Sequence, residues 1–456
     1  MNSRNPSLYL LLTILLIGSV ACRQDTKPVE LKTAVEQVKH PDWSVNVSIY
    51  EVNVRQFTNE GTFEALEGHL PRIKKLGTDI IWLMPINPIG VKNRKGELGS
   101  YYSVKDYKAI NPEFGDSVSF KKFVQEAHDE GLKVIIDWVA NHSAWDNALV
   151  TQHPDWYAKD STGKMFSPFD WTDVVKFDYS VPAMREYMLG AMKYWVQQYD
   201  IDGFRCDVAG EVPMDFWDNT RKELDKIKPV FMLAEAEGPQ FHSAFDMTYG
   251  WEFHHIMNKI YKGEAGPDDI EKYLKKNDSL YPKDAYRMYF ITNHDENTWN
   301  GSEFERLGKS VKAFFTLSTL VPGMPLVYSG QESGMEKRLE FFKRDPIQWG
   351  NYPMAAFYQS ILDLKSEHPA LFNGKEGGSW KRIKTSNDKT VFAILRQKKE
   401  RQVLGVFNLS NKDVTISIDN SDLKDELTNL NDGSKIIVTP DTRIMIPAWS
   451  YQILLR

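Results

Sequence analysis

Short apolar runs alternate with longer amphipathic stretches along most of this chain. In the amphipathic stretches, among them 63–77, 120–131 and 183–199, apolar residues recur every three or four positions, and this spacing predicts helices. The runs between them are almost continuously apolar, which is typical of strands in a parallel sheet with both faces covered. Eight such runs predict strands, at 47–54, 79–85, 133–141, 202–207, 230–235, 244–250, 287–295 and 324–330.

Eight strands that alternate with helices predict the α/β class and a closed (β/α)8 TIM barrel over 46–371. A doubly wound open sheet is the alternative, but no G-x-G-x-x-G follows the first strand. The connection after the third strand, 142–181, is too long for a simple turn. We therefore expect an insertion there, on the barrel face where active sites form.

Beyond residue 371 the pattern changes to short alternating strands separated by Asn, Asp and Gly. Such alternation with frequent turn residues predicts antiparallel pairing. We expect a separate C-terminal β-sandwich domain over 372–456.

The first 45 residues predict export. An apolar run at 8–20 follows Arg4 and ends in small residues, and it is short for a membrane-spanning helix. This predicts a signal peptide over 1–21, with a short uncleaved anchor as the alternative. The polar and charged residues of 22–45 predict a tether.

Cys22 resembles the lipid-carrying cysteine of a bacterial lipobox, although Ser19 stands where Leu is usual. The resemblance implies lipidation at Cys22 and an exported protein anchored to a bacterial membrane, on its periplasmic or cell-surface side. Cys206 then has no disulfide partner. Because it alternates with Arg205 along a strand, we expect Cys206 to face the outer helices in a packing role.

Composition narrows the partners only slightly. The 456 residues carry a net charge of -6, and no basic stripe suggests a nucleic-acid partner. Aromatic residues make up 12% of the chain. Their flat faces suit sugar rings, but they also fill cores.

Three acids stand where predicted strands end: Asp207, Glu235 and Asp295. At the carboxyl ends of barrel strands they would converge on one pit, and glycoside hydrolysis needs such paired carboxylates. Arg205 shares a strand face with Asp207 and favours its ionised form, unless the two are simply a structural ion pair. Glu235 has no cation next to it in sequence and is therefore the better candidate for a protonated acid.

Four blocks in order resemble the α-amylase family, glycoside hydrolase family 13: "IIDWVANH" (135–142), "DGFRCD" (202–207), "MLAEAEG" (232–238) and "FITNHD" (290–295). The resemblance covers about 46–456 and implies a catalytic site. In it Asp207 is the nucleophile, Glu235 the acid/base and Asp295 the third acid, which grips sugar hydroxyls. It also implies substrate-binding roles for Tyr102, His142, Arg205 and His294.

Some residues depart from the family pattern. Ala234 stands where Gly is usual, and Glu237 is an alternative acid two residues beyond Glu235. After Asp207 the sequence "VAGEV" lacks the Lys-His of many endo-acting α-amylases. It is closer to the neopullulanase and cyclomaltodextrinase branch.

The chemistry requires no cofactor, but calcium stays open. Asn141 resembles a calcium ligand of the family, and calcium needs six to eight oxygen ligands. The insertion shows no spaced acid cluster of the calcium-loop kind. Asp146, Asp155, Asp170 and Asp173 are either ligands or solvated loop acids, and we favour the second reading.

The resemblance implies a retaining glycosidase that cleaves α-1,4 bonds of starch-derived glucans or maltooligosaccharides, with carboxyl groups about 5–5.5 Å apart. A transglycosylase using the same residues is the first alternative. A non-catalytic sugar-binding protein on the same fold is the second.

Overall fold

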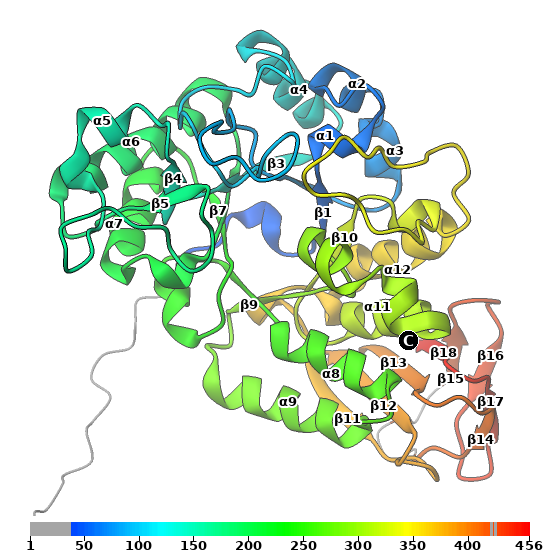
Figure 1. The fold of residues 1–456 in the computed structure, drawn as a ribbon. Coiled ribbons are helices and arrows are strands. Elements are labelled where there is room, and N and C mark those ends of the chain that lie inside the picture. Colours follow the sequence, from blue (N-terminus) through cyan, green and yellow to red (C-terminus); the bar gives the residue numbers. More distant parts are fainter. Residues whose placement is uncertain (1–37, 420–422, 424–425) are drawn as a thin grey trace, which may run out of the picture. The chain divides into compact units, whose positions relative to one another are not determined.

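Eight parallel strands close into a barrel in the order β1-β10-β9-β8-β7-β6-β3-β2. Figure 1 labels β1, β3, β7, β9 and β10 among them. The computed structural model describes residues 38–419, 423 and 426–456. Every predicted apolar run overlaps one barrel strand, although β9 ends well before the predicted residue 295, and the predicted fold class is confirmed. The strands are β1 (Ile49–Val52), β2 (Ile80–Leu83), β3 (Lys133–Trp138), β6 (Gly203–Cys206), β7 (Phe231–Ala234), β8 (Met247–Tyr249), β9 (Tyr286–Tyr289) and β10 (Met324–Tyr328).

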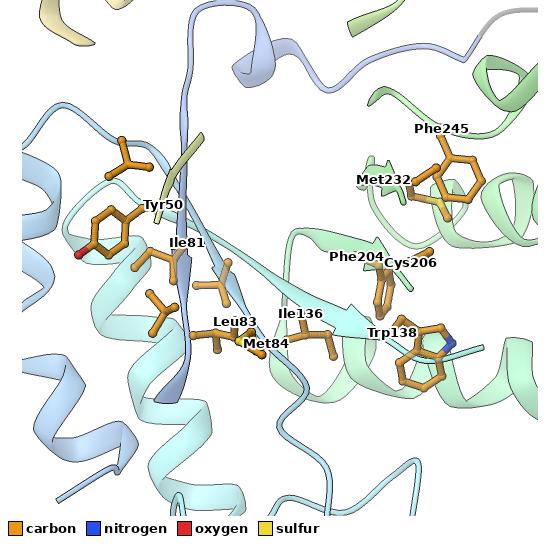
Figure 2. Close-up of a cluster of buried hydrophobic side chains, with 14 of the residues drawn as sticks. Tyr50, Ile81, Leu83, Met84, Ile136, Trp138, Phe204, Cys206, Met232 and Phe245 are labelled. Atoms are coloured by element: carbon orange, nitrogen blue, oxygen red, sulfur yellow. The ribbon is translucent and has the colours of Figure 1, made fainter. Parts of the chain in front are cut away.

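Side chains alternate between the two faces of these strands and form two cores. On the outward face Ile81, Ile136 and Phe204 pack among the helices, as Figure 2 shows, together with Cys206. On the inward face residues such as Trp82 fill the barrel interior. Cys206 is fully buried on the outward face, where the sequence placed it.

Helices surround the barrel, and their ends follow local chemistry. α4 begins at Ser117, before the predicted residue 120, because the Asp116 carboxylate accepts from the backbone of Val118 and Ser119. The stretch at 63–77 forms two short helices. The helices are α1 (Val54–Phe57), α2 (Phe63–Glu67), α3 (Leu70–Lys75), α4 (Ser117–Asp129), α6 (Pro182–Tyr199), α7 (Met214–Asp225), α8 (Trp251–Tyr261), α9 (Pro267–Leu280), α10 (Glu303–Leu307), α11 (Val311–Leu320) and α12 (Ala355–Glu367).

The connection between β3 and α6 has its own structure. It holds a small antiparallel pair, β4 (His142–Ala144) and β5 (Val174–Lys176), and the one-turn helix α5 (Leu149–Gln152). This insertion begins shortly after the carboxyl end of β3, and His142 and Trp171 from it line the same cavity as Asp207 and Glu235.

The C-terminal strands form two antiparallel sheets around a core of their own. They contact α11, where Arg396 donates to the carbonyl oxygen of Leu320 at 2.7 Å. Figure 1 shows them in orange to red. The larger sheet holds β11 (Ser379–Ile383), β12 (Val391–Lys398), β13 (Arg401–Asn408), β18 (Tyr451–Leu455), β15 (Glu426–Asn429) and β16 (Lys435–Ile437), and the smaller holds β14 (Val414–Ile416) and β17 (Ile444–Ile446).

Residues before position 46, the predicted start of the barrel, already pack against it. His40 lies 2.7 Å from the Asp246 carboxylate, and the Trp43 ring contacts Phe231. The end of the predicted tether is therefore part of the folded unit. The predicted signal peptide and Cys22 lie within 1–37, outside the described residues. Among the residues that are described, no helix is both long and apolar enough to cross a membrane.

Candidate active site

Charged residues replace apolar ones at inward positions where the strands end. Glu51 on β1, Asp137 on β3 and Arg205 on β6 are fully buried, and Asp207 follows β6 directly. Buried charges are tolerated when they are paired. Arg205 pairs with Asp137 and Asp207. Because side chains alternate along each strand, these residues all point into the barrel at its carboxyl end.

Arg205 is the centre of this arrangement. Its Nη1 atom lies 2.8 Å from Asp137 Oδ1 and 3.1 Å from Asp207 Oδ1. Its Nη2 atom lies 2.9 Å from Glu235 Oε1, but in a direction that makes no hydrogen bond. The guanidinium group thus touches three carboxylates from three strands. No cation stands next to Glu235 in the sequence, but in the folded protein Arg205 lies beside Glu235 as well as Asp207.

The two candidate catalytic carboxylates influence each other. Burial and the neighbouring Glu235 raise the pKa of Asp207 well above its ordinary value, and they outweigh the ion pair with Arg205. A carboxyl group that is buried beside a second carboxylate keeps its proton to higher pH than an isolated one. An acid and a carboxylate can therefore coexist in this site.

Val208 links the two carboxylates through the backbone. Its N–H donates to Glu235 Oε2 at 2.7 Å, and its φ of 36° lies in the left-handed region. A β-branched residue rarely adopts this conformation, and strain of this kind concentrates at functional sites. The turn after Asp207 is thus held in the conformation that fixes Glu235.

A second buried chain of contacts reaches the site from β1. Glu51 Oε1 lies 2.5 Å from His294 Nδ1, and His294 Nε2 lies 2.7 Å from the Tyr102 hydroxyl. That hydroxyl donates to Asp137 at 3.1 Å. Burial lowers the pKa of His294, but the charges of Asp295 and Glu51 outweigh it and raise the pKa to about 9. His294 is therefore positively charged at neutral pH.

The predicted site residues surround a single cavity of about 300 Å³. Arg205 does not line it but contacts two residues that do, Asp207 and Glu235. Burial lowers the pKa of His142 to about 3, so this residue is neutral. The predicted residues that line the cavity are Tyr102, His142, Asp207, Glu235, His294 and Asp295.

Other lining residues were not predicted from the sequence. Trp171 and Asp173 come from the insertion, Trp299 follows Asp295, and Phe341 follows β10. Asp137 and Glu51 were also missed, although each interrupts an apolar strand at an inward position. A lone acid in such a strand is a signal for a buried functional group.

A second hollow adjoins the first and shares Trp171, Val208 and Glu235 with it. Its other walls come from the insertion and from the segments after β6 and β7, including Phe169 and Phe241. Glu235 therefore stands between two compartments of one cleft. Asp207 lies in the first compartment only.

Glu237, the alternative acid, belongs to a different ion pair. Its carboxylate lies 2.8 Å from Arg287 Nη2 and makes none of the contacts that join Glu235 to Arg205 and Val208. It lines only the second compartment. The geometry favours Glu235 as the acid.

Acidic, histidine and cysteine side chains do not cluster around a possible ion in the part of the chain that the structure describes. No group of three or more His, Cys, Asp or Glu side chains among the described residues is placed to hold an ion. The carbonyl oxygen of Asn141, the residue that resembles a calcium ligand, accepts from the backbone of Phe177 at 3.0 Å. Asp173 is buried at the cavity wall rather than being a solvated loop acid. No step proposed for this chain uses calcium.

Comparisons with known proteins agree with this geometry. Residues 43–396 match the family described as "Alpha amylase, catalytic domain". The α-amylase MalA of Haloarcula japonica is 28% identical over 353 residues, which are 73% of this chain and 50% of the relative. The maltogenic α-amylase of Bacillus acidopullulyticus is 26% identical over 86% of this chain and 70% of its own.

Among solved structures, the noncanonic maltogenic α-amylase AmyB of Thermotoga neapolitana superposes with a TM-score of 0.83 at 31% identity. The match covers 90% of this chain and 98% of that one. The likeness thus extends over almost the whole folded part of both proteins, barrel and C-terminal sheets together.

Proposed function

The chain belongs to the α-amylase family of glycosidases, and we propose that it hydrolyses α-1,4 bonds of maltooligosaccharides or related glucans with retention of configuration. The observation that carries this proposal is the contact of one guanidinium group, that of Arg205, with both Asp207 and Glu235. Retaining glycosidases hold their carboxyl groups about 5–5.5 Å apart, closer than inverting ones. A shared cation is a direct way to keep two carboxyl groups close.

The place of Glu235 suits a general acid, because it stands between the two compartments of the cleft. Oε2 accepts from the backbone of Val208, and Arg205 Nη2 lies 2.9 Å from Oε1 without a hydrogen bond. That cation favours the ionised form of Glu235, so the role of acid rests on the position of this side chain. Asp207 Oδ1 accepts from Arg205, and this contact stabilises the carboxylate that attacks.

The reaction then takes two steps. The Asp207 carboxylate attacks the anomeric carbon, the glycosidic C–O bond breaks, and the Glu235 proton passes to the leaving oxygen. A water molecule next gives a proton to Glu235. The oxygen of this water attacks the anomeric carbon, and the bond between that carbon and Asp207 breaks. Asp295 binds sugar hydroxyls in the first compartment, where His294 supplies a positive charge and the Tyr102 ring supplies a face for the sugar.

The two compartments bind different parts of the substrate. The donor sugar, which bonds to Asp207, occupies the first compartment, and the leaving part of the substrate occupies the second, beyond Glu235. Aromatic rings continue on the donor side, where Phe341 lies parallel to Tyr102 with centroids 6.3 Å apart. Trp299 follows, 5.5 Å from Phe341. Such rings are suitable surfaces for an extended glucan.

Proton NMR of maltoheptaose incubated with the protein tests this function. Early α-anomeric products support retention, and early β-anomeric products would refute it. Asp207→Asn should abolish turnover while maltoheptaose still binds. If maltoheptaose, cyclodextrin and pullulan all stay intact, the assignment to α-1,4-glucans is wrong.

Transglycosylation remains the second candidate because the second compartment carries apolar rings. Phe169 is 65% exposed there, and Trp171 and Phe241 lie beside it. A sugar bound against these rings would compete with water for the glycosyl-enzyme. Products longer than maltoheptaose in the same experiment would identify this reaction.

A further inference from the structure

The wall of the cleft opposite Glu235 is formed by segments that follow β2 and β10. In the closed order of strands, β2 and β10 both lie next to β1, on the side of the barrel away from β7, which carries Glu235. The segment after β2 contributes Lys95 and Ser100 to the first compartment. The donor end of the cleft therefore meets the segment 91–99.

This segment is fastened on both sides of the cleft. Towards β10, Leu98 N donates to Phe342 O at 2.9 Å, and a Cβ atom on Gly96 would lie 2.4 Å from Phe342 Cβ. Towards the insertion, the Asp146 carboxylate accepts from Val91 N at 3.1 and 3.2 Å. The segment 91–99 thus runs as a strap between the β10 side and the insertion.

Lys95 faces the cavity from this strap. Its Nζ atom donates to the carbonyl oxygen of Asp170 at 3.3 Å and lies 3.6 Å from Asp173 Oδ1. Asp173 is only 2% exposed, and its Oδ2 atom has no hydrogen-bond partner. A buried carboxylate oxygen without a partner is unfavourable, and a donor from the substrate would relieve it.

We propose that the strap 91–99 closes the donor end of the cleft and that Lys95 and Asp173 bind the non-reducing end of the glucan. This inference rests on the proposed glycosidase function and adds which bond of the substrate is cut. A chain that enters until its end reaches the strap has one fixed register against Asp207. The protein then releases one short product of uniform length.

The chemistry of the pair suits a chain end. A sugar hydroxyl both donates and accepts, so it can donate to Asp173 and accept from the Lys95 ammonium group. In a linear α-1,4-glucan only the sugar at the non-reducing end has a free 4-hydroxyl, because in every other sugar that oxygen is glycosidic and has no hydrogen to donate. A site built around a hydroxyl strongly rejects groups that lack one.

The first test uses maltoheptaose with a fluorescent tag at its reducing end. Tagged fragments of a single length should dominate early in the reaction. A 4,6-ethylidene block on the non-reducing end should lower kcat/KM by about 10- to 100-fold, the loss expected for hydrogen bonds to charged groups. Cleavage at many bonds, or equal rates for blocked and free chains, would overturn the inference and leave the proposed hydrolysis standing.

The second test uses variants. Lys95→Ala and Asp173→Asn should spread the cuts over several bonds and make the enzyme indifferent to the block. Lys92→Ala is the matched control, because Lys92 lies on the same strap but contacts the Trp145 ring and does not line the cavity. A Lys95→Ala enzyme that keeps the uniform product, with a melting temperature like that of the control, would refute the role of Lys95. Absence of any cleavage by the wild type would instead refute the proposed function.

Discussion

The carboxylate of Glu51 lies 2.5 Å from the imidazole Nδ1 of His294, and both side chains are buried where the barrel meets the cleft. The two residues are 243 positions apart in sequence. This contact joins the first strand of the barrel to the residue next to Asp295. Together with the charge of Asp295, it raises the pKa of His294 and keeps the imidazole positively charged at neutral pH.

We predict a pH-dependent contribution of His294 to stability. Its pKa is about 9 in the folded protein, raised by Asp295 and Glu51 against the effect of burial, and near 6.5 when unfolded. The contribution is complete below pH 6.5 and is lost as the pH rises through 9, a change of about 3 kcal/mol in the free energy of unfolding. Urea unfolding of Glu51→Gln should show a weaker decline over this range. The exposed Glu336→Gln should match the wild type, and equal slopes in all three proteins would contradict the prediction.

Glu235→Gln and Glu237→Gln should differ sharply in activity. Loss of a general acid should lower kcat by about 10²- to 10⁴-fold, whereas Glu237→Gln should keep kcat close to wild type. Steady-state kinetics on maltoheptaose measure the difference. On a glycosyl fluoride, which needs little help from an acid, added azide should rescue Glu235→Gln. Failure of that rescue, together with a large loss in Glu237→Gln, would transfer the role to Glu237.

Arg205→Ala should destabilise the protein strongly. It leaves Asp137, Asp207 and Glu235 without their common cation, and breaking a buried pair costs about 3–5 kcal/mol. The loss should be smaller at pH 4 than at pH 7, because protonated carboxyl groups tolerate burial better. Chemical denaturation at the two pH values checks both statements. A loss below about 1 kcal/mol at pH 7 would show that the barrel compensates for the missing charge.

Gly203→Ala should disturb the strand that carries Arg205 and Asp207. A Cβ atom at Gly203 would lie 1.9 Å from the carbonyl oxygen of Phe231 on the neighbouring strand. We expect a loss of about 3 kcal/mol or more in the free energy of unfolding, with reduced kcat.

Gly190→Ala provides the matched comparison. Gly190 lies in α6, and a Cβ atom there meets nothing within 4 Å. Alanine in a helix interior should therefore stabilise the protein by about 0.5–1 kcal/mol. Thermal unfolding of the two variants should shift the midpoint in opposite directions. Shifts of the same sign would contradict this account of β6.

The architecture could be predicted from the sequence because it depends on local periodicity. Each barrel strand is an apolar run, and each surrounding helix has an apolar stripe, so the order of elements follows from patterns a few residues long. Asp207 and Glu235 were located in the same way, because each directly follows a strand, whereas Asp295 lies in the segment after β9, which ends at Tyr289. Chain reversal at those ends then places all three on one barrel face.

The interactions between distant residues could not be predicted in this way. The sequence showed an acid at position 51 and a histidine at 294, but only the closure of the barrel brings them into contact. Glu235 and Glu237 have the same side chain and lie two residues apart, so local pattern does not distinguish them. Their partners, Arg205 and Arg287, come from other strands. The sequence predicted a solvated loop acid at Asp173, whereas the folded insertion buries this side chain at the cavity wall. Local pattern decides which elements form, whereas burial and charge pairing between elements decide what each side chain can do, because those energies depend on neighbours that only the folded chain brings together.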